Sequence, residues 1–383
     1  MNENHLQQIF ANYIEKFEEL NAPGPEEYYK WQIAKQFKPM MDDALNSDDV
    51  EFIEKLKQIK KQTGNFIDNY TQPFGGLIKF AREPGETGTV RKMFQKLYED
   101  DGGDLNLRQK RIEEFLQESH RLRARYTPES YLYKDDFHSV TGYLFLYDPD
   151  HNYIYKATHA QRFADCVEFY DDFGSGDHVK LKNYYRMCDQ LVDAIQKNEV
   201  LKKTDESRFQ NGWGVDSNTF YPDKAKHILA FDIIYCCSTY NLFRGITFTR
   251  PKIKERQLMQ DKQEKAQELL NKLKSAQIQK KKLDQARQDV CSILDVGMDV
   301  KHSLYGNGRI TSKNENTITV IFANGKEMKL GMPECITAGF ISVEAEENVN
   351  RLVEAKEILK KTSAIECSLS YAEKQFAPYS EYI

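Results

Sequence analysis

The stretch that decides the fold is residues 252–296, KIKERQLMQDKQEKAQELLNKLKSAQIQKKKLDQARQDVCSILDV, which contains no Gly or Pro over 45 positions. A run of good helix formers this long predicts one long helix. Apolar residues recur at two heptad positions, which are Met259, Ala266, Leu273 and Leu294, and Leu269, Ala276, Leu283 and Val290. Lys262, Lys280 and Arg287 interrupt this stripe, so we expect an imperfect coiled-coil seam that packs on a neighbour or bridges two domains.

Short strands are predicted directly after this helix. Residues 297–343 contain five candidate strands, at 300–304, 308–311, 317–322, 326–330 and 340–343. Turn residues separate them, and Asn324-Gly325 between two alternating runs is a strong hairpin signal. Five strands in so short a segment predict a small SH3- or Tudor-like β-barrel. Residues 344–383 follow as a charged helix and a tail whose aromatic side chains we expect to dock.

The chain before the long helix divides into two regions that we expect to form one unit. Residues 1–130 show apolar side chains at three- and four-residue steps, which predicts helices. Residues 131–250 change character, because 15 of the 60 residues at 126–185 are aromatic. A β-rich run at 140–147, the turn Asp148-Pro149-Asp150 and a second run at 153–156 predict a hairpin. An apolar stretch at 227–235 fits a strand or a buried helix equally well.

These segments define an α+β protein. We expect a mainly helical N-terminal region with a small aromatic-rich sheet, a long connecting helix at 251–296, and a small SH3/Tudor-like barrel near the C-terminus. The long helix would set the spacing between the two folded parts.

Composition narrows the class of protein. The chain has 54 Lys+Arg against 59 Asp+Glu, and this net charge of −5 argues against a uniformly basic nucleic-acid coat protein but leaves a local basic face open. No run of eighteen apolar residues and no secretory signal pattern occur, so we expect no membrane span. The seven Cys lack disulfide-framework spacing, which indicates a reducing cytoplasm.

Catalytic and metal-binding motifs are missing from the sequence. There is no GxxxxGK[ST] phosphate loop, no CxxC pair, no HExxH and no GxSxG elbow. His138, His151, His159 and His178 are scattered, although Asp177-His178 would form an acid/base pair on paper. We therefore expect no cofactor, no metal and no enzyme, with a cryptic metal-dependent nuclease using acids and histidines from 138–232 as an alternative.

Two sets of side chains are candidates for nucleic-acid binding. The phosphate-binding candidates are Lys301, His302, Tyr305, Arg309, Lys326 and Lys329 on the barrel, and Lys280, Lys281 and Lys282 on the long helix. The barrel segment has five Lys/Arg against four Asp/Glu, so its charge supports phosphate binding only weakly. The base-stacking candidates on the predicted sheet are Tyr143, Phe145, Tyr147, Tyr153 and Tyr155. A sheet packed on helices by its aromatic face explains the same rings, and we weigh it above stacking.

The barrel segment resembles a known domain. Residues 300–310, VKHSLYGNGRI, are similar to the start of the Tudor-like C-terminal domain of UvrD/PcrA-type helicases, whose pattern is roughly V-x-H-x-x-F/Y-G-x-G-x-V/I. Val320-Ile321-Phe322 continue the likeness. The resemblance implies the fold of the segment and a contact with nucleic acid, RNA polymerase or another protein.

A second resemblance covers residues 72–197. The segments VRKMFQKLY (90–98), RIEEF (111–115), YLFLYDP (143–149) and YIYK (153–156) carry it. They resemble the region upstream of the ATPase domain in McrB-like restriction proteins, but the ATPase motifs of that family are missing here. The resemblance implies a bacterial defence or DNA-recognition setting.

The leading hypothesis is therefore a non-catalytic bacterial protein that associates with nucleic acid, with DNA favoured. It would act in a restriction or anti-phage system beside a separate effector such as an ATPase or nuclease. The alternative is an interaction adaptor whose barrel binds a polymerase or helicase and whose long helix forms a homodimer.

Overall fold

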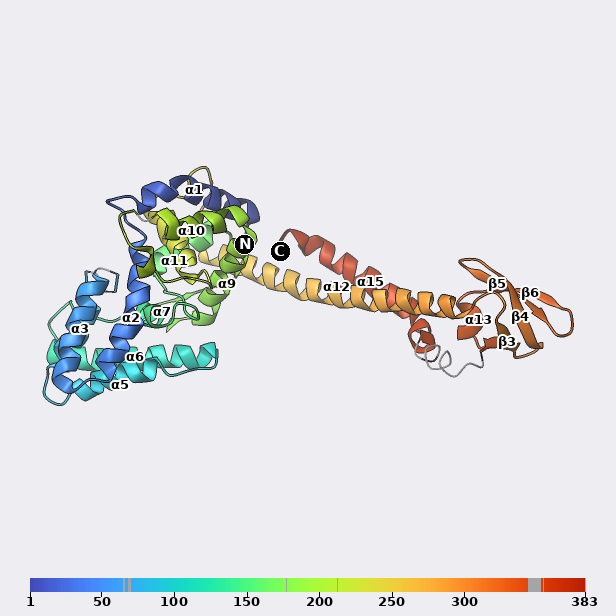
Figure 1. Ribbon diagram of the computed structural model, residues 1–383, viewed down its shortest axis with the longest axis horizontal. Helices are drawn as coiled ribbons and strands as arrows, with labels where there is room; N and C mark the ends of the chain where they lie inside the picture. Colours follow the sequence, from blue (N-terminus) through green and yellow to red (C-terminus); the bar gives the residue numbers. More distant parts are fainter. Residues whose placement is uncertain are drawn as a thin grey trace. The chain divides into compact units, whose positions relative to one another are not determined.

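The computed structural model describes residues 1–383 apart from residues 65, 68, 69, 177, 212, 344–352, 354 and 383. The chain forms two compact units, Met1–Gln257 and Leu258–Ile383. Figure 1 shows that the first unit is a body of helices, whereas the second combines two long helices with a small sheet. The α+β class is thus confirmed, with the strands concentrated in the second unit.

The first unit consists mainly of helices. Their bounds are α1 (Glu3–Asn21), α2 (Tyr29–Leu45), α3 (Asp49–Thr63), α4 (Pro73–Ala81), α5 (Thr87–Leu97), α6 (Leu105–Tyr126), α7 (Phe137–Tyr147), α8 (Ala157–Cys166), α9 (Leu181–Lys197), α10 (Glu199–Asn211) and α11 (His227–Thr239). A two-residue ladder, β1 (Gly174–Ser175) with β2 (His178–Val179), and the 3-10 turn η1 (Ser217–Thr219) complete it. The expectation that residues 1–130 are helical is confirmed.

Capping side chains set the helix starts. Asn2 accepts a hydrogen bond from the N–H of His5 at the start of α1, and Asp48 accepts from the N–H groups of Val50 and Glu51 at the start of α3. Each cap satisfies N–H groups that have no partner within the helix. The chain after α1 leaves the helical conformation at Ala22, just before Pro23-Gly24-Pro25.

The predicted aromatic hairpin is wrong, because residues 137–147 form helix α7. A capping box starts this helix: Asp136 accepts from the N–H of Ser139, whose hydroxyl accepts from the N–H of Asp136. All side chains from 140 to 146 are buried. A segment that is buried on every side lacks the alternation that distinguishes a strand from a helix, so its β-branched and aromatic content was misleading. Residues 153–156 are extended but pair with no strand among the described residues.

Aromatic side chains fill the core of the first unit. The rings of Phe74, Phe94, Phe115 and Tyr143 pack with centroid separations of 5.3–6.1 Å. Helix α11, which contains the ambiguous stretch 227–235, is also largely buried. The high aromatic content is thus core packing between helices, each ring removing a large apolar area from water.

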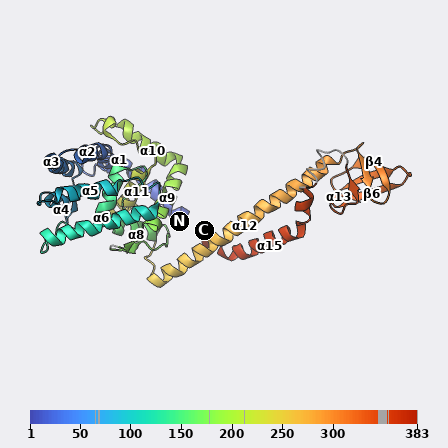
Figure 2. The same ribbon diagram turned by 90° about the horizontal axis from the view of Figure 1, so that it is seen from below.

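The long helix that the sequence predicts is α12 (Ile253–Ile293), and from Leu258 onwards it belongs to the second unit. Helix α15 (Thr362–Phe376) runs beside it in both views (Figures 1 and 2). Ala266, Leu269 and Ala276 of the apolar stripe are buried. The stripe that suggested a coiled coil is therefore covered within the chain.

Polar contacts fix the C-terminal segment to α12. The Nζ of Lys280 and a terminal nitrogen of Arg287 lie 3.1 and 3.4 Å from the carboxylate of Glu366 in α15. In the final turn η2 (Ala377–Tyr382), the hydroxyl of Tyr382 accepts a hydrogen bond of 2.9 Å from Lys262. The tail therefore docks, as its aromatic residues predicted.

A five-stranded antiparallel sheet follows α12, in the order β6-β5-β4-β3-β7. The bounds are β3 (Asp299–His302), β4 (Gly306–Lys313), β5 (Thr317–Phe322), β6 (Glu327–Gly331) and β7 (Ile341–Ser342). The sheet is curled, and the short helix α13 (Glu334–Thr337) contacts both edge strands. The five strands are confirmed, and a closed SH3- or Tudor-like barrel remains a prediction.

Glycine is required at two positions of the predicted motif for different physical reasons. Gly306 has φ +73°, a conformation that costs a residue with a Cβ atom. A Cβ on Gly308 would lie 2.6 Å from the Phe322 ring and 2.8 Å from Val320, so glycine is needed there for close packing of β4 on β5.

The expected helix at 344–361 falls partly outside the described residues. Among the residues that are described, no helix combines the length and apolar character needed to cross a membrane.

Candidate anion-binding groove

An open groove of about 1060 Å³ lies in the first unit between the start of α7, the start of α8, the β1–β2 ladder and the segment that follows α11. We call it the α7–α8 groove. Its charged or titratable lining residues are Lys134, Asp136, His138, Lys156, His159, Arg162, Asp165 and Arg250.

The groove has an excess of unpaired positive charge. Lys134, Lys156, Arg162 and Arg250 form no ion pair with any residue that the structure describes. Of the two acids of the lining, Asp165 pairs with Arg256, whereas Asp136 caps α7 and keeps its negative charge, so the cations remain in excess. The groove therefore presents cations that an anionic ligand would neutralise.

The start of α8 adds partial positive charge to the groove. Lys156 is the N-cap residue of α8 and its side chain makes no capping hydrogen bond. Ala157 and Thr158 in the first turn line the groove and are exposed. Unsatisfied N–H groups at a helix start favour anions, in the same direction as the four cations.

Two histidines share the groove. His138 contacts the carbonyl oxygen of Tyr155 through Nδ1 at 3.2 Å, and burial, partly opposed by Asp136, lowers its pKa. The His159 ring stacks on Tyr235 with centroids 5.1 Å apart. Burial first, and then nearby cations led by Lys156, lower the pKa of His159 to about 4. Both rings are therefore neutral at pH 7 in the absence of a ligand.

Lys156 lies on the floor of this region, against an aromatic ring. Its Nζ is 4.7 Å from the centre of the Tyr235 ring, and the Nζ of Lys30 is 4.2 Å from the same centre. Burial, and then the charge of Lys30, lower the pKa of Lys156. The amine of Lys156 thus loses its proton more readily than an ordinary lysine does.

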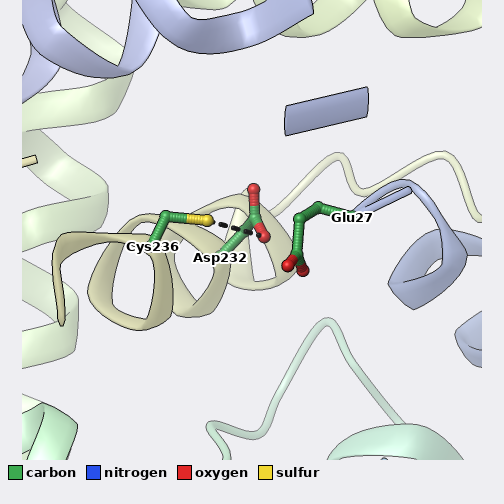
Figure 3. Close-up of side chains that lie close together, drawn as sticks. All are labelled: Glu27, Asp232 and Cys236. Atoms are coloured by element: carbon green, nitrogen blue, oxygen red, sulfur yellow. Dashed lines mark hydrogen bonds between the residues drawn. The ribbon is translucent and has the colours of Figure 1, made fainter. Parts of the chain in front are cut away.

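A separate buried cluster holds Lys30. Glu27 lies just before α2, whereas Asp232 and Cys236 lie one turn apart on α11 (Figure 3). All three are buried, and their potential ligand atoms lie within 4.8 Å of one another, which is compatible with a metal site.

Lys30 occupies the place that a metal ion would take. Its Nζ lies 2.6 Å from Glu27 Oε2 and forms a close ion pair with Asp232. The Tyr13 hydroxyl donates a 2.6 Å hydrogen bond to the other oxygen of Asp232, and Tyr240 donates to Glu27. Burial alone would lower the pKa of Lys30, but Asp232, Cys236 and Glu27 outweigh it and raise that pKa well above its ordinary value. The cluster is therefore a buried ion-pair network centred on Lys30.

The phosphate-binding candidates on the C-terminal sheet are partly engaged within it. Arg309 pairs with Asp299 at 2.8 Å, and the Nζ of Lys326 donates to the Tyr305 hydroxyl at 3.0 Å. His302 is buried, stacks on Phe340 and accepts a hydrogen bond from the N–H of Leu304. Lys301 and Lys329 are exposed.

The candidates on the long helix also divide into one residue with ion-pair partners and two that are exposed. Lys280 pairs with Asp284 and Glu366, both at 3.1 Å. Lys281 and Lys282 are exposed. The structure therefore does not gather the nine predicted phosphate contacts into one site.

The base-stacking candidates do not lie on a sheet. Tyr143 and Phe145 are fully buried in α7, and Tyr153 and Tyr155 are 3% and 5% exposed. Tyr147 is half-buried, stacks on Tyr98 at 3.8 Å and donates to Asp42. Because protein atoms cover these rings, the burial contradicts the prediction of an exposed stacking surface.

The cations of the α7–α8 groove were not predicted from the sequence. Its four cations come from segments up to 116 positions apart, at Lys134 and Arg250, and no local motif joins them. Of the four scattered histidines only His138 and His159 line the groove; His151 pairs with Asp148, and Asp177 lies outside the described residues. Comparison of the chain with protein families, with curated proteins and with solved structures finds no match.

Proposed function

We propose that the protein binds nucleic acid through the α7–α8 groove, with the phosphate backbone as the main contact. Four basic side chains from three segments, two of them on α8 and its N-cap, line one groove without an acidic partner among the described residues, and this observation carries the proposal. Such cations bind phosphates by releasing the counterions that surround a nucleic acid. The N–H groups at the start of α8 add a backbone contact of the kind that fixes a phosphate in position.

The size of the groove favours a polyanion over a single small anion. A volume of about 1060 Å³ is far larger than one phosphate requires, whereas a backbone with several phosphates would meet several of the lining cations. The bacterial defence setting, the separate effector and the cytoplasmic location remain expectations. The alternative of a metal-dependent nuclease would need a metal site, and the group of potential ligands found among the described residues surrounds Lys30.

Charge reversal in the full-length protein tests the proposal. Fluorescence anisotropy would measure binding to labelled single-stranded and duplex DNA of about 20 nucleotides at about 50 and 200 mM salt. The double variant Lys134→Glu/Arg250→Glu is expected to weaken binding at least about tenfold and to flatten its salt dependence. The matched control is Lys281→Glu/Lys282→Glu, which reverses two exposed charges on α12. No binding by the natural chain at low salt, or a loss confined to the control, would overturn the proposal.

Protein binding by the C-terminal sheet is the second candidate function. Its Arg309 and Lys326 are already engaged, while an open cleft of about 720 Å³ is lined by apolar residues, among them Met298, Ile321 and Val343, as well as by Asp299, Lys301 and Arg309. Apolar surface of this kind suits a protein partner better than phosphates. The variant Lys301→Glu/Lys329→Glu should therefore leave DNA affinity unchanged. A loss of about tenfold would show that the sheet contributes to nucleic-acid binding.

A further inference from the structure

Lys156 differs from the other cations of the α7–α8 groove. Lys134, Arg162 and Arg250 are exposed, whereas Lys156 is partly buried with its Nζ over the ring of Tyr235. No described acid pairs with it, although Lys30 beside the same ring pairs with two. A cation placed only to meet phosphates would gain nothing from this position.

The neighbours of Lys156 favour its uncharged form. From α2, Lys30 is held as a cation by Glu27 and Asp232. From α7 and α8, His138 and His159 offer no negative charge, and Tyr235 of α11 offers only its ring. Glu27 opposes the loss of the proton more weakly than burial and Lys30 favour it, and the face of the Tyr235 ring, which attracts a cation, opposes it as well. Desolvation beside a second cation is a known way to make a lysine amine nucleophilic.

We propose that Lys156 forms a Schiff base with an aldehyde carried next to a phosphate group, as in the ring-opened sugar of an abasic site in DNA. This inference rests on the proposed function, since the remaining cations of the groove would hold the adjacent phosphates. The aldehyde carbon would then lie against Nζ while the phosphates meet Lys134, Arg162 or Arg250.

The chemistry balances without a co-reactant. The lone pair of Nζ attacks the carbonyl carbon, the carbonyl π electrons move to oxygen, and a proton passes from nitrogen to that oxygen. The resulting carbinolamine then loses its hydroxyl group and one proton from nitrogen as water, which leaves the imine. His138 and His159 line the same groove, and in this proposal they carry these protons.

Two sources of a phosphate-linked aldehyde are distinguishable. The full-length protein would be incubated near neutral pH with cyanoborohydride and either a single-stranded oligonucleotide containing one abasic site or glyceraldehyde 3-phosphate. Denaturing gels and peptide mass spectrometry would locate the reduced adduct. We expect Lys156 to carry more of the label than Lys134, because burial and the charge of Lys30 leave more of its amine unprotonated.

Matched variants complete the test. Lys156→Arg keeps the charge and should abolish the adduct, whereas Lys281→Arg on α12 should leave it unchanged. Labelling of Lys156 by the oligonucleotide supports the inference with DNA as the source, and labelling by glyceraldehyde 3-phosphate alone supports it with a small aldehyde. Label absent from Lys156, or spread evenly over exposed lysines, overturns it, and this mapping in the natural chain remains decisive if Lys156→Arg does not fold. The proposed function fails separately, if an intact oligonucleotide does not bind.

Discussion

Lys30 and Asp232 form an ion pair in which each side chain is only 1% exposed. The pair connects α2 to α11, and Glu27 contributes a second carboxylate 2.6 Å from the same ammonium. Removing these charges from water costs several kcal/mol per ion, and good geometry with full hydrogen bonding is needed to offset it. Each partner therefore depends on the others being present.

Replacing Lys30 by Met should destabilise the first unit strongly. The substitution keeps the length of the side chain but leaves two buried carboxylates without a cation, so we expect the free energy of unfolding to fall by about 3–5 kcal/mol. Urea unfolding would measure it. The control is Lys57→Met, whose ion pair with Glu54 is exposed and should be worth less than about 1 kcal/mol. Equal effects of the two substitutions would contradict the account of the buried pair.

Zinc should not stabilise the protein, although Glu27, Asp232 and Cys236 have the spacing of a ligand set. The ammonium of Lys30 lies between the two carboxylates, and a divalent ion there would meet its charge at close range. Thermal unfolding with zinc in slight excess, or with EDTA, should give the same midpoint as the untreated protein. A midpoint that rises with zinc and no longer does so in Cys236→Ser would show that the ion displaces Lys30.

Local signals predicted much of the fold. The long helix follows from the lack of Gly and Pro between 252 and 296, and the strands of the C-terminal sheet follow from alternation and from Asn324-Gly325, where Gly325 has φ +79°. These elements depend on neighbouring residues. Helix α7 is not determined by residues close to it in the sequence, because the residues that bury it come from α2, α6 and other distant segments. The β-propensity of residues 140–147 is therefore overridden by tertiary packing.

The candidate site was harder to predict than the fold. Tyr143 and Phe145 are core residues that composition alone could not separate from exposed ones. Lys134 and Arg250 meet in one groove only because the helices between them return the chain to the same place. The lowered pKa of Lys156 results from burial and from the charge of Lys30, which is 126 positions earlier in the sequence.

His159 should make the protein less stable in mild acid. An unfolded histidine titrates near pH 6.5, whereas burial and then Lys156 and the other cations lower the pKa of His159 to about 4 in the folded chain. The unfolded state thus binds more protons than the folded state between these two pH values. The contribution of His159 to the stability of the fold is therefore intact above about pH 6.5 and is lost as the pH falls towards 4. Because His159 is half-buried, solvent screening reduces the effect to about 1–2 kcal/mol.

Urea unfolding near pH 7.5 and 4.5 would measure this contribution. The loss of stability between the two pH values should be smaller by that amount in His159→Gln than in the natural protein. Thr158→Ala, at the exposed neighbouring position, is the control and should keep the full loss. An identical loss in all three proteins would show that His159 titrates normally in the fold.

Leu269 should stabilise the second unit by packing within the chain. It is 5% exposed on the face of α12 that α15 covers, whereas Leu258 on the same helix is 54% exposed. We expect Leu269→Ala to lower the free energy of unfolding by about 2 kcal/mol, near the lower end for a buried leucine because the helix seam is narrow. It should also speed proteolysis of the residues after 361. Leu258→Ala is the control and should change neither. Light scattering could contradict this account. If the natural protein is a dimer and Leu269→Ala dissociates it, the apolar stripe of α12 packs mainly against a second copy and not against α15.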